Sequence, residues 1–92
     1  MNYRILVCPV AYNERVKIKN VIDRFLKSRA FGKTDYCVID DGSDDGTSEV
    51  IAGYAPQGVK TVKHPQRSGV GAAIRTAIRY AQNNQYDVLV TM

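Results

Sequence analysis

Long apolar segments are missing from this sequence of 92 residues. The apolar run nearest the amino terminus, residues 5–10, contains Pro9 and is followed closely by Asn13 and Glu14. Such a run is too short for the apolar region of a signal peptide and far too short to cross a bilayer. We therefore expect a cytoplasmic, soluble segment, whose membrane association would come from surface contact or from sequence outside these residues.

Cysteine is also scarce, with only Cys8 and Cys37 in the sequence. Both lie inside apolar, strand-like runs, and neither belongs to a Cys-x-x-Cys pair or has a histidine beside it. Cysteines in that setting usually behave as small buried apolar residues in a reducing compartment. A disulfide between them has no support beyond the count of two.

Blocks of like charge are absent as well. The net charge is +4, and no run of Lys and Arg reaches five residues. A solvated basic surface is the simplest interpretation, with a mild preference for anionic partners such as phosphates or a membrane surface. We expect no nucleic-acid partner. The 45% hydrophobic content is ordinary for a globular protein and argues against disorder.

Apolar periodicity divides the chain into alternating strands and helices. Strand-like runs at residues 4–10, 36–39, 59–63 and 86–92 are separated by segments of helical periodicity. The order β-α-β-α-β-α-β indicates a parallel sheet with right-handed crossovers. We predict an α/β fold, a Rossmann-like three-layer α/β/α arrangement with a mostly parallel sheet, in one domain covering residues 1–92. Pairing of the first strand should loosen at Pro9.

Each predicted helix carries an apolar stripe. The first, with Asn13 as N-cap and Gly32 as its stop, has the stripe Ile18, Val21, Ile22, Phe25 and Leu26. The second is capped by Ser43 or Asp44, carries Val50, Ile51 and Tyr54, and is broken at Gly53, Pro56 and Gly58. The third has the clearest stripe, which consists of Val70, Ala73, Ile74, Ala77, Ile78 and Ala81.

Four aspartates directly follow the predicted strand 36–39. They are Asp40, Asp41, Asp44 and Asp45, in a turn that contains Gly42. Carboxylates without partners are too costly to bury, so this turn is not part of the core. Open α/β sheets bind their ligands at the carboxyl ends of their strands. The turn therefore predicts a ligand site.

Three kinds of ligand site match the chain only in part. A calcium loop starting at Asp41 would need a bidentate Glu where Ala52 stands, and it would follow a helix rather than a strand. A dinucleotide fingerprint on Gly69 and Gly71 has Ile74 in place of its third glycine, so these glycines are as well explained by helix packing as by phosphate contact. A phosphate-transfer receiver would need a further Asp and a later Lys that cannot be placed.

Three segments taken together resemble one family. They are residues 8–14 (Cys-Pro-Val-Ala-Tyr-Asn-Glu), residues 39–43 (Ile-Asp-Asp-Gly-Ser) and residues 69–73 (Gly-Val-Gly-Ala-Ala). In this order and spacing they look like the nucleotide-binding amino-terminal half of family-two glycosyltransferases with the GT-A fold. The branch they resemble most is that of polyprenol-phosphate and dolichol-phosphate mannose synthase-like transferases. The resemblance covers essentially the whole chain.

The resemblance implies roles for individual residues. Those it places at the nucleotide are Pro9, Tyr12, Asn13 and Glu14 beside the nucleoside, Asp40 and Asp41 at the base and ribose, and Arg67 and Gly69 at the base or diphosphate. A carboxylate can accept the imide N–H of uracil, or the N1–H and amino group of guanine. We interpret Asp44 and Asp45 as helix-capping residues and His64 as a loop histidine rather than a catalyst.

The resemblance also implies what these residues lack. The family holds Mg²⁺ or Mn²⁺ with an Asp-x-Asp motif after its fourth strand, and its catalytic base lies further on, whereas this sequence stops at Met92. We expect a parent inverting hexosyltransferase that uses a UDP- or GDP-sugar and an acceptor such as polyprenyl phosphate. The 92-residue segment alone is expected to be inactive and to hold no metal. The alternative is a non-enzymatic Rossmann-like nucleotide-binding or interaction module. The exposed fourth strand predicts a homo-oligomer.

Overall fold

In the part of the chain that the structure describes, five strands form a single sheet, and every pairing between them is parallel. The computed structural model describes residues 3–28 and 34–92. The strands are β1 (Ile5–Cys8), β2 (Val10–Ala11), β3 (Asp35–Asp40), β4 (Val59–Lys63) and β5 (Val88–Thr91). The prediction of a mostly parallel sheet is therefore confirmed. The last strand is shorter than the predicted range 86–92.

The first predicted strand is divided at Pro9 into β1 and β2. Both parts pair with β3 in one continuous register, with Val7 opposite Tyr36 and Val10 opposite Ile39. Proline has no N–H to donate to the ladder, but its carbonyl oxygen accepts a hydrogen bond from the Ile39 amide at 2.8 Å. Pairing is thus interrupted at this residue, as the sequence predicted.

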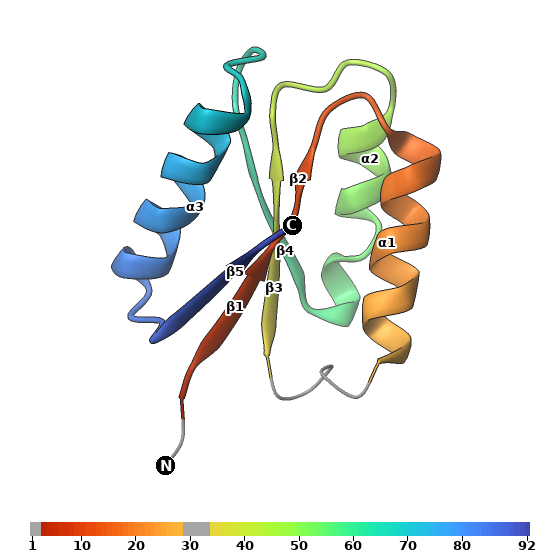
Figure 1. The fold of residues 1–92 in the computed structure, drawn as a ribbon. Coiled ribbons are helices and arrows are strands. Elements are labelled where there is room, and N and C mark those ends of the chain that lie inside the picture. The colour runs from red at the N-terminus through yellow and green to blue at the C-terminus, as the bar shows by residue number, and fades with distance from the viewer. Residues whose placement is uncertain (1–2, 29–33) are drawn as a thin grey trace.

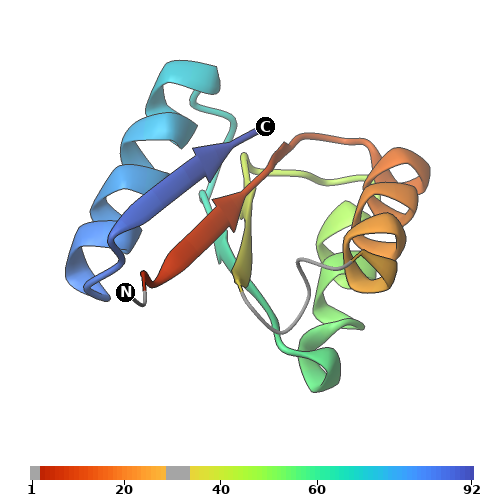
Figure 2. The ribbon, with the colours of Figure 1, turned by 60° about the horizontal axis from the view of Figure 1, so that its bottom comes forward.

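The strand order reverses beside β1. β4 pairs with β3, β3 pairs with β1 and β2, and β5 pairs with the other side of β1. The chain therefore builds the sheet outward in one direction and then returns to add β5 on the opposite side (Figure 2). Such a reversal opens a crevice at the carboxyl ends of the two strands beside it. This crevice lies between the ends of β2 and β5.

Helices cover both faces of the sheet. Helices α1 (Arg15–Lys27) and α2 (Thr47–Ala52) lie on one face, and α3 (Val70–Asn83) lies on the other (Figure 1). A short 3₁₀ helix, η1 (Ala55–Gln57), follows α2. The three-layer α/β/α architecture predicted from the sequence is confirmed. No helix within residues 3–28 and 34–92 is long and apolar enough to span a membrane.

Side chains that alternate along the strands divide the core in two. Val7, Tyr36 and Val38 pack with Ile18, Ile22 and Ile51 on the face covered by α1 and α2. On the other face, the residues packed under the alanines of α3 are Leu6, Cys8, Cys37 and Ile39. Both cysteines are free and buried, as expected. The predicted stripe of α1 is confirmed, because all its members belong to or pack against the first cluster.

The stripe of α3 is only partly buried. Ala73, Ala77 and Ala81 face the sheet, whereas Val70 is 66% exposed and Ile78 is 41% exposed. The alanines lie four residues apart, so they form one row along the helix, and their small side chains allow a close approach to the strands. Ile78 lies outside that row and is partly exposed to solvent.

Two predicted helix starts are wrong. Asn13 adopts a left-handed conformation with φ of 47°, and α1 begins after Glu14 at the N-cap. Helix α2 begins after Gly46, whose φ is 100°, rather than after Ser43 or Asp44. The reason is that the Ser43 and Asp44 amides donate to Asp40 and Asn13 in a longer turn that comes before the helix. Gly32, the predicted stop of the first helix, lies outside the described residues.

Candidate nucleotide-binding cleft

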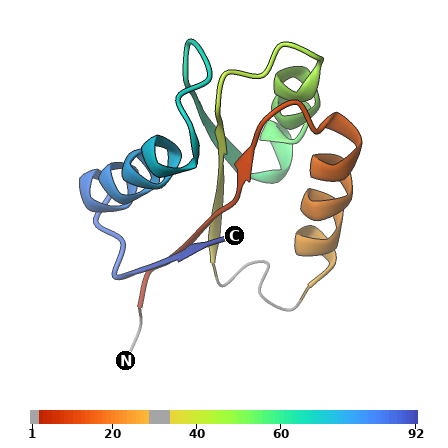
Figure 3. The same cartoon turned by 45° about the horizontal axis from the view of Figure 1, so that its top comes forward.

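Three loops meet at the carboxyl edge of the sheet. They connect β2 to α1, β3 to α2, and β4 to α3, and Figure 3 shows them together at the top of the molecule. The segments that the sequence analysis placed at the nucleotide come from these loops, although they are far apart in the sequence. Because the strands are parallel, one edge of the sheet receives all of them.

A cleft of about 360 Å³ opens at this edge, beside the reversal of strand order. We call it the switch-point cleft, and its lining residues are Val10, Tyr12, Glu14, Asp41, Arg67, Gly69, Val70, Ile74, Thr91 and Met92. Five of the eight residues predicted to bind nucleotide are on its wall: Tyr12, Glu14, Asp41, Arg67 and Gly69. The other three, Pro9, Asn13 and Asp40, do not line it.

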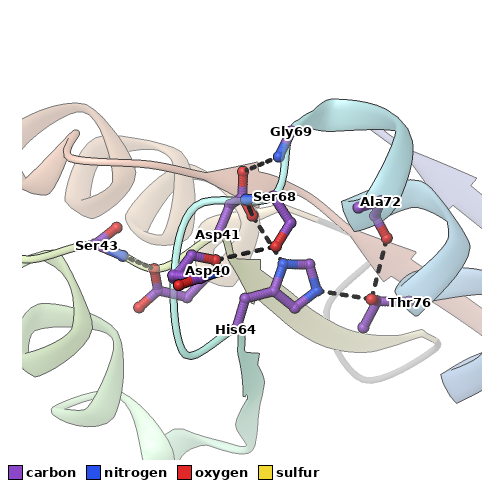
Figure 4. Close-up of polar contacts among 9 residues, drawn as sticks. Asp40, Asp41, Ser43, His64, Ser68, Gly69, Ala72 and Thr76 are labelled. Atoms are coloured by element: carbon purple, nitrogen blue, oxygen red, sulfur yellow. Dashed lines mark hydrogen bonds and ion pairs between the residues drawn. The ribbon is translucent and has the colours of Figure 1, made fainter.

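Asp41 is the most extensively bonded acid of the cleft. Its Oδ1 accepts hydrogen bonds from His64 Nδ1 at 2.8 Å and from the Ser68 amide at 2.9 Å. Its Oδ2 accepts one from the Gly69 amide, also at 2.9 Å. Figure 4 shows how these donors, all from the β4–α3 loop, converge on the one carboxylate. Asp41 therefore fixes the position of that loop over the cleft.

The electrostatic balance at Asp41 favours its charged form. Burial by itself would raise the pKa of this carboxyl group, since Asp41 is only 3% exposed. The hydrogen bond from His64 and those from the Ser68 and Gly69 amides oppose that effect, and they hold the pKa below its ordinary value. An ionised acceptor therefore lies at the cleft wall throughout the neutral pH range.

His64 links Asp41 to helix α3. Its Nε2 lies 2.7 Å from Thr76 Oγ1, and the Thr76 hydroxyl donates to the Ala72 carbonyl oxygen at 3.1 Å. The imidazole is thus held at both nitrogens (Figure 4). Sequence analysis interpreted His64 as a loop histidine, and it does lie in the loop. Its link to Asp41 could not be seen from the sequence, because the two residues are brought together only by pairing of β3 with β4.

Arg67 brings positive charge to the same cleft. Its guanidinium carbon lies 4.6 Å from the centre of the Tyr12 ring, an arrangement of the cation–π type that joins two of the three loops. Within the described part of the chain Arg67 forms no ion pair with a carboxylate. Its five N–H donors therefore remain available to a ligand.

Asp40 is part of the turn rather than of the cleft wall. It is 1% exposed, and its Oδ1 accepts from the Ser43 amide at 3.0 Å while its Oδ2 accepts from the Ser48 hydroxyl. Both oxygens are therefore engaged with the chain itself. Asp40 fixes the turn that presents Asp41, and it connects that turn to α2.

Asn13 joins the β2–α1 loop to the acidic turn. Its side-chain amide donates to Asp44 Oδ1 at 3.0 Å, and its Oδ1 accepts from the Asp44 amide at 2.9 Å. The Asn13 amide also donates to Ser43 Oγ at 3.0 Å, and the Glu14 amide donates to Thr47 Oγ1 at 2.9 Å. This clamp holds the β2–α1 loop, which contributes Tyr12 and Glu14 to the cleft wall, against the acidic turn.

The helix-capping interpretation of the last two acids is half right. Asp45 Oδ1 accepts from the Thr47 amide at 3.0 Å, so it does satisfy a donor in the first turn of α2. Asp44 instead bonds Asn13, as described above, and caps nothing. Its role was misread because sequence spacing cannot show a partner in another loop.

Gly42 allows the acidic turn to touch the β4–α3 loop. Its φ is +77°, and a Cβ at this position would lie 2.4 Å from the Gln66 carbonyl carbon and 2.5 Å from the Arg67 nitrogen. These distances are well inside contact range. Only glycine therefore lets the two loops approach closely enough to place Asp41 and Arg67 on the same cleft.

Half of the cleft wall consists of residues that the sequence motifs do not indicate. The missed residues are Val10, Val70, Ile74, Thr91 and Met92. Val70 and Ile74 have helical spacing and were interpreted as core, while the others close an apolar strand. The one available signal was their position at strand ends and at a helix start, since side chains there face the carboxyl edge.

The described residues do not fit a divalent metal ion by themselves. No cluster of three or more His, Cys, Asp or Glu side chains that could hold one occurs within residues 3–28 and 34–92. Both oxygens of Asp40 are bonded within the turn, and Asp41 already accepts three hydrogen bonds. The acidic turn is thus a hydrogen-bonding structure.

A parallel sheet with a polar cleft at its point of strand reversal is typical of nucleotide-binding α/β proteins. Comparison with known proteins agrees with this class. The profile of glycosyl transferase family 2 matches residues 6–92, so the chain belongs to that family.

Two curated relatives indicate which branch of the family this chain resembles. A dolichyl-phosphate beta-glucosyltransferase of Trichomonas vaginalis is 31% identical over 90 residues, covering 87% of this chain and 26% of that protein. A polyprenol monophosphomannose synthase of Mycolicibacterium smegmatis is 32% identical over 92 residues, covering 97% of this chain and 34% of that protein. The chain thus spans between a quarter and about a third of the length of these relatives, and the resemblance to dolichol- and polyprenol-phosphate sugar transferases is confirmed.

A solved structure agrees with the fold. The mannosyltransferase PcManGT from Pyrobaculum calidifontis, in complex with GDP-Man and Mn²⁺, superposes with a TM-score of 0.78 at 27% identity. The match covers 88% of this chain and 25% of that one. The predicted relation to GT-A glycosyltransferases is therefore confirmed.

Proposed function

We propose that this chain forms the part of a family-two glycosyltransferase that holds the nucleotide of a nucleoside-diphosphate-sugar donor. The observation that carries this proposal is the pairing of an ionised acceptor, Asp41, with a free cationic donor, Arg67, on one cleft. Nucleobase edges present donors and acceptors side by side, so a carboxylate next to a guanidinium is complementary to them. The Tyr12 ring supplies a flat apolar surface beside both.

The base lies against Asp41, Arg67 and Tyr12, and the ribose and diphosphate extend toward Gly69 and the end of β5. Gly69 is the N-cap of α3, and because its own amide already donates to Asp41, the diphosphate would use the helix dipole and the amides that follow Gly69 in the first turn. Glu14 is also on the cleft wall, and the three predicted residues that do not line the cleft hold the surrounding chain in place. Asp40 holds the acidic turn, Asn13 clamps two loops together, and Pro9 sets the end of the first strand.

The parent enzyme transfers the sugar to an acceptor by direct displacement with inversion. A polyprenyl phosphate acceptor is supported by the names of the curated relatives, which are dolichyl-phosphate and polyprenol transferases. The structural neighbour was solved with Mn²⁺, and a divalent ion neutralises a leaving diphosphate. Because the described residues do not fit that ion, its ligands and the catalytic base belong to other residues of a longer protein. We place the protein in the cytoplasm, with membrane contact made by such residues.

Nucleotide binding by the purified 92-residue chain tests the proposal directly. Calorimetry should show weak binding of UDP or GDP and its loss in Asp41→Ala, since a charge-assisted hydrogen bond is worth about 1.5–3 kcal/mol. Asp44→Asn is the charge control, because it removes a negative charge from the same turn while its side-chain oxygen can still accept from Asn13 and the cleft wall is not touched. Tyr12→Ala provides a second variant that leaves the Asp41 hydrogen bonds intact. Equal affinity in wild type and in both cleft variants would contradict the proposal.

A second test measures sugar transfer, which we propose for the parent enzyme but not for the 92-residue chain by itself. We expect no sugar transfer from UDP- or GDP-sugars by the 92-residue chain, with or without added Mn²⁺, because the described residues hold no metal cluster. Product formation in a radiolabelled-sugar assay would show that the catalytic groups are present in this segment after all. Nucleotide binding without turnover is the expected result.

A further inference from the structure

The carboxylate of Asp41 has a limited number of acceptor positions. An ionised carboxylate offers about four lone-pair sites, two on each oxygen. Three of these accept from the chain itself, from His64 Nδ1 and the Ser68 amide on Oδ1 and from the Gly69 amide on Oδ2. One position therefore remains, and it is on Oδ2. Since Asp41 lines the switch-point cleft, this is the position that a ligand can use.

The three internal donors are fixed. The Ser68 and Gly69 amides belong to the backbone that leads into α3, which cannot turn away without breaking the start of the helix. The His64 ring is held from its other side by Thr76, and a hydrogen must lie on Nδ1, because two bare lone pairs 2.8 Å apart would repel each other. A ligand that enters the cleft therefore meets a carboxylate with one free acceptor. Figure 4 shows the donors that occupy the other positions.

Uracil and guanine, the two bases expected from the family, differ in the number of hydrogen bonds that they donate to this carboxylate. Uracil presents a single imide N–H between two carbonyl groups, and Arg67 has donors for a carbonyl. Guanine presents two donors on one edge, N1–H and the amino group, and its full recognition by a carboxylate uses both oxygens. With Oδ1 filled by His64 and Ser68, one guanine donor would be left without an acceptor.

From this count we infer that the cleft selects uracil over guanine, and that His64 is the positioning residue that sets the choice. The inference rests on the proposed function, because it names the base of the same donor nucleotide. His64 acts by occupying an acceptor on Oδ1 that guanine would need, while leaving the Oδ2 acceptor to the imide N–H. It contacts Asp41 rather than the ligand.

Calorimetric titration of the 92-residue chain with UDP and GDP tests the base choice. We expect UDP to bind about tenfold more tightly or better, which is the ratio given by one charge-assisted hydrogen bond left unmade. 3-Methyluridine 5′-diphosphate is the matched probe, because it differs from UDP only in lacking the imide N–H, and it should bind at least about tenfold more weakly than UDP. GDP affinity equal to or above that of UDP would overturn the inference and leave the proposed function standing. Absence of binding by either nucleotide would overturn the proposed function itself.

Two variants of His64 test its part in the choice. In His64→Ala the second Oδ1 acceptor becomes free, so the UDP-to-GDP affinity ratio should fall to within about threefold, mainly through tighter GDP binding. In His64→Asn the side-chain amide can occupy the place of Nδ1, and the ratio should stay near that of wild type. Circular dichroism establishes that each variant is folded. A ratio unchanged in folded His64→Ala would refute the role of His64, and the wild-type ratio decides the base choice even if that variant does not fold.

Discussion

Substitution of Gly42 by alanine gives the sharpest test of how the loops are assembled. The new Cβ would lie 2.4 Å from the Gln66 carbonyl carbon, 2.8 Å from its Cα and 2.5 Å from the Arg67 nitrogen, all of which are backbone atoms. A backbone cannot swing aside as a flexible side chain can. The acidic turn and the β4–α3 loop must therefore separate, or the turn must change conformation.

Two terms make up the expected cost. A left-handed conformation costs a residue with a Cβ about 1–2 kcal/mol. Forcing an extra carbon into a packed contact costs about 1–3 kcal/mol more. The sum of about 2–5 kcal/mol is a large part of the total stability of about 5–15 kcal/mol that is usual for a domain.

Gly58→Ala is the matched control. Gly58 has φ of +90°, and a Cβ there would meet no atom within 4 Å, so only the conformational term applies. With a urea m-value of about 2 kcal/mol per molar, Gly58→Ala should lower the unfolding midpoint by about 0.5–1 M and Gly42→Ala by about 1–2.5 M. Nucleotide affinity should fall in Gly42→Ala alone, because Arg67 moves. Equal midpoints for the two variants would refute the close approach of the loops.

Three further predictions concern acid stability, the loop clamp and self-association. The pKa of Asp41 is lowered in the folded chain, so the ionised carboxylate stabilises the fold above the unfolded pKa of about 3.9. This stabilisation is lost as the pH falls through the folded pKa. Urea midpoints measured from pH 7 to pH 3 should therefore fall less steeply in Asp41→Asn than in wild type. Asn13→Ala and Asn13→Gly both remove the clamp hydrogen bonds to Asp44, and Asn13→Ala should be the less stable of the two by about 1–2 kcal/mol because of the positive φ at this position. Thermal unfolding measures the difference, and equal losses would exclude strain at this residue. Val90 is 43% exposed on β5, an edge strand among the described residues, and we expect it to promote dimers or larger species. Sedimentation should show fewer such species in Val90→Lys. A wild-type monomer at high concentration would contradict this.

The sequence determined the architecture because architecture depends on local patterns. Apolar runs separated by segments with helical spacing specify a parallel three-layer fold, and β4 and α3 were found where the periodicity placed them. The site was also foreseeable in outline, since the carboxyl ends of parallel strands meet at one edge. Motif order then indicated the family.

Only the tertiary structure decided which groups each of the four aspartates of the acidic turn bonds. Asp40 and Asp41 are adjacent and chemically identical, yet one bonds its own turn and α2 while the other bonds a loop that begins more than twenty residues later. Asp44 and Asp45 separate in the same way, toward Asn13 and toward Thr47. Alternation along the backbone sends neighbouring side chains in different directions, and their partners exist only once β2, β3 and β4 are paired. For that reason the sequence located the turn, whereas pairing of the strands assigned Asp41 to the cleft and His64 to Asp41.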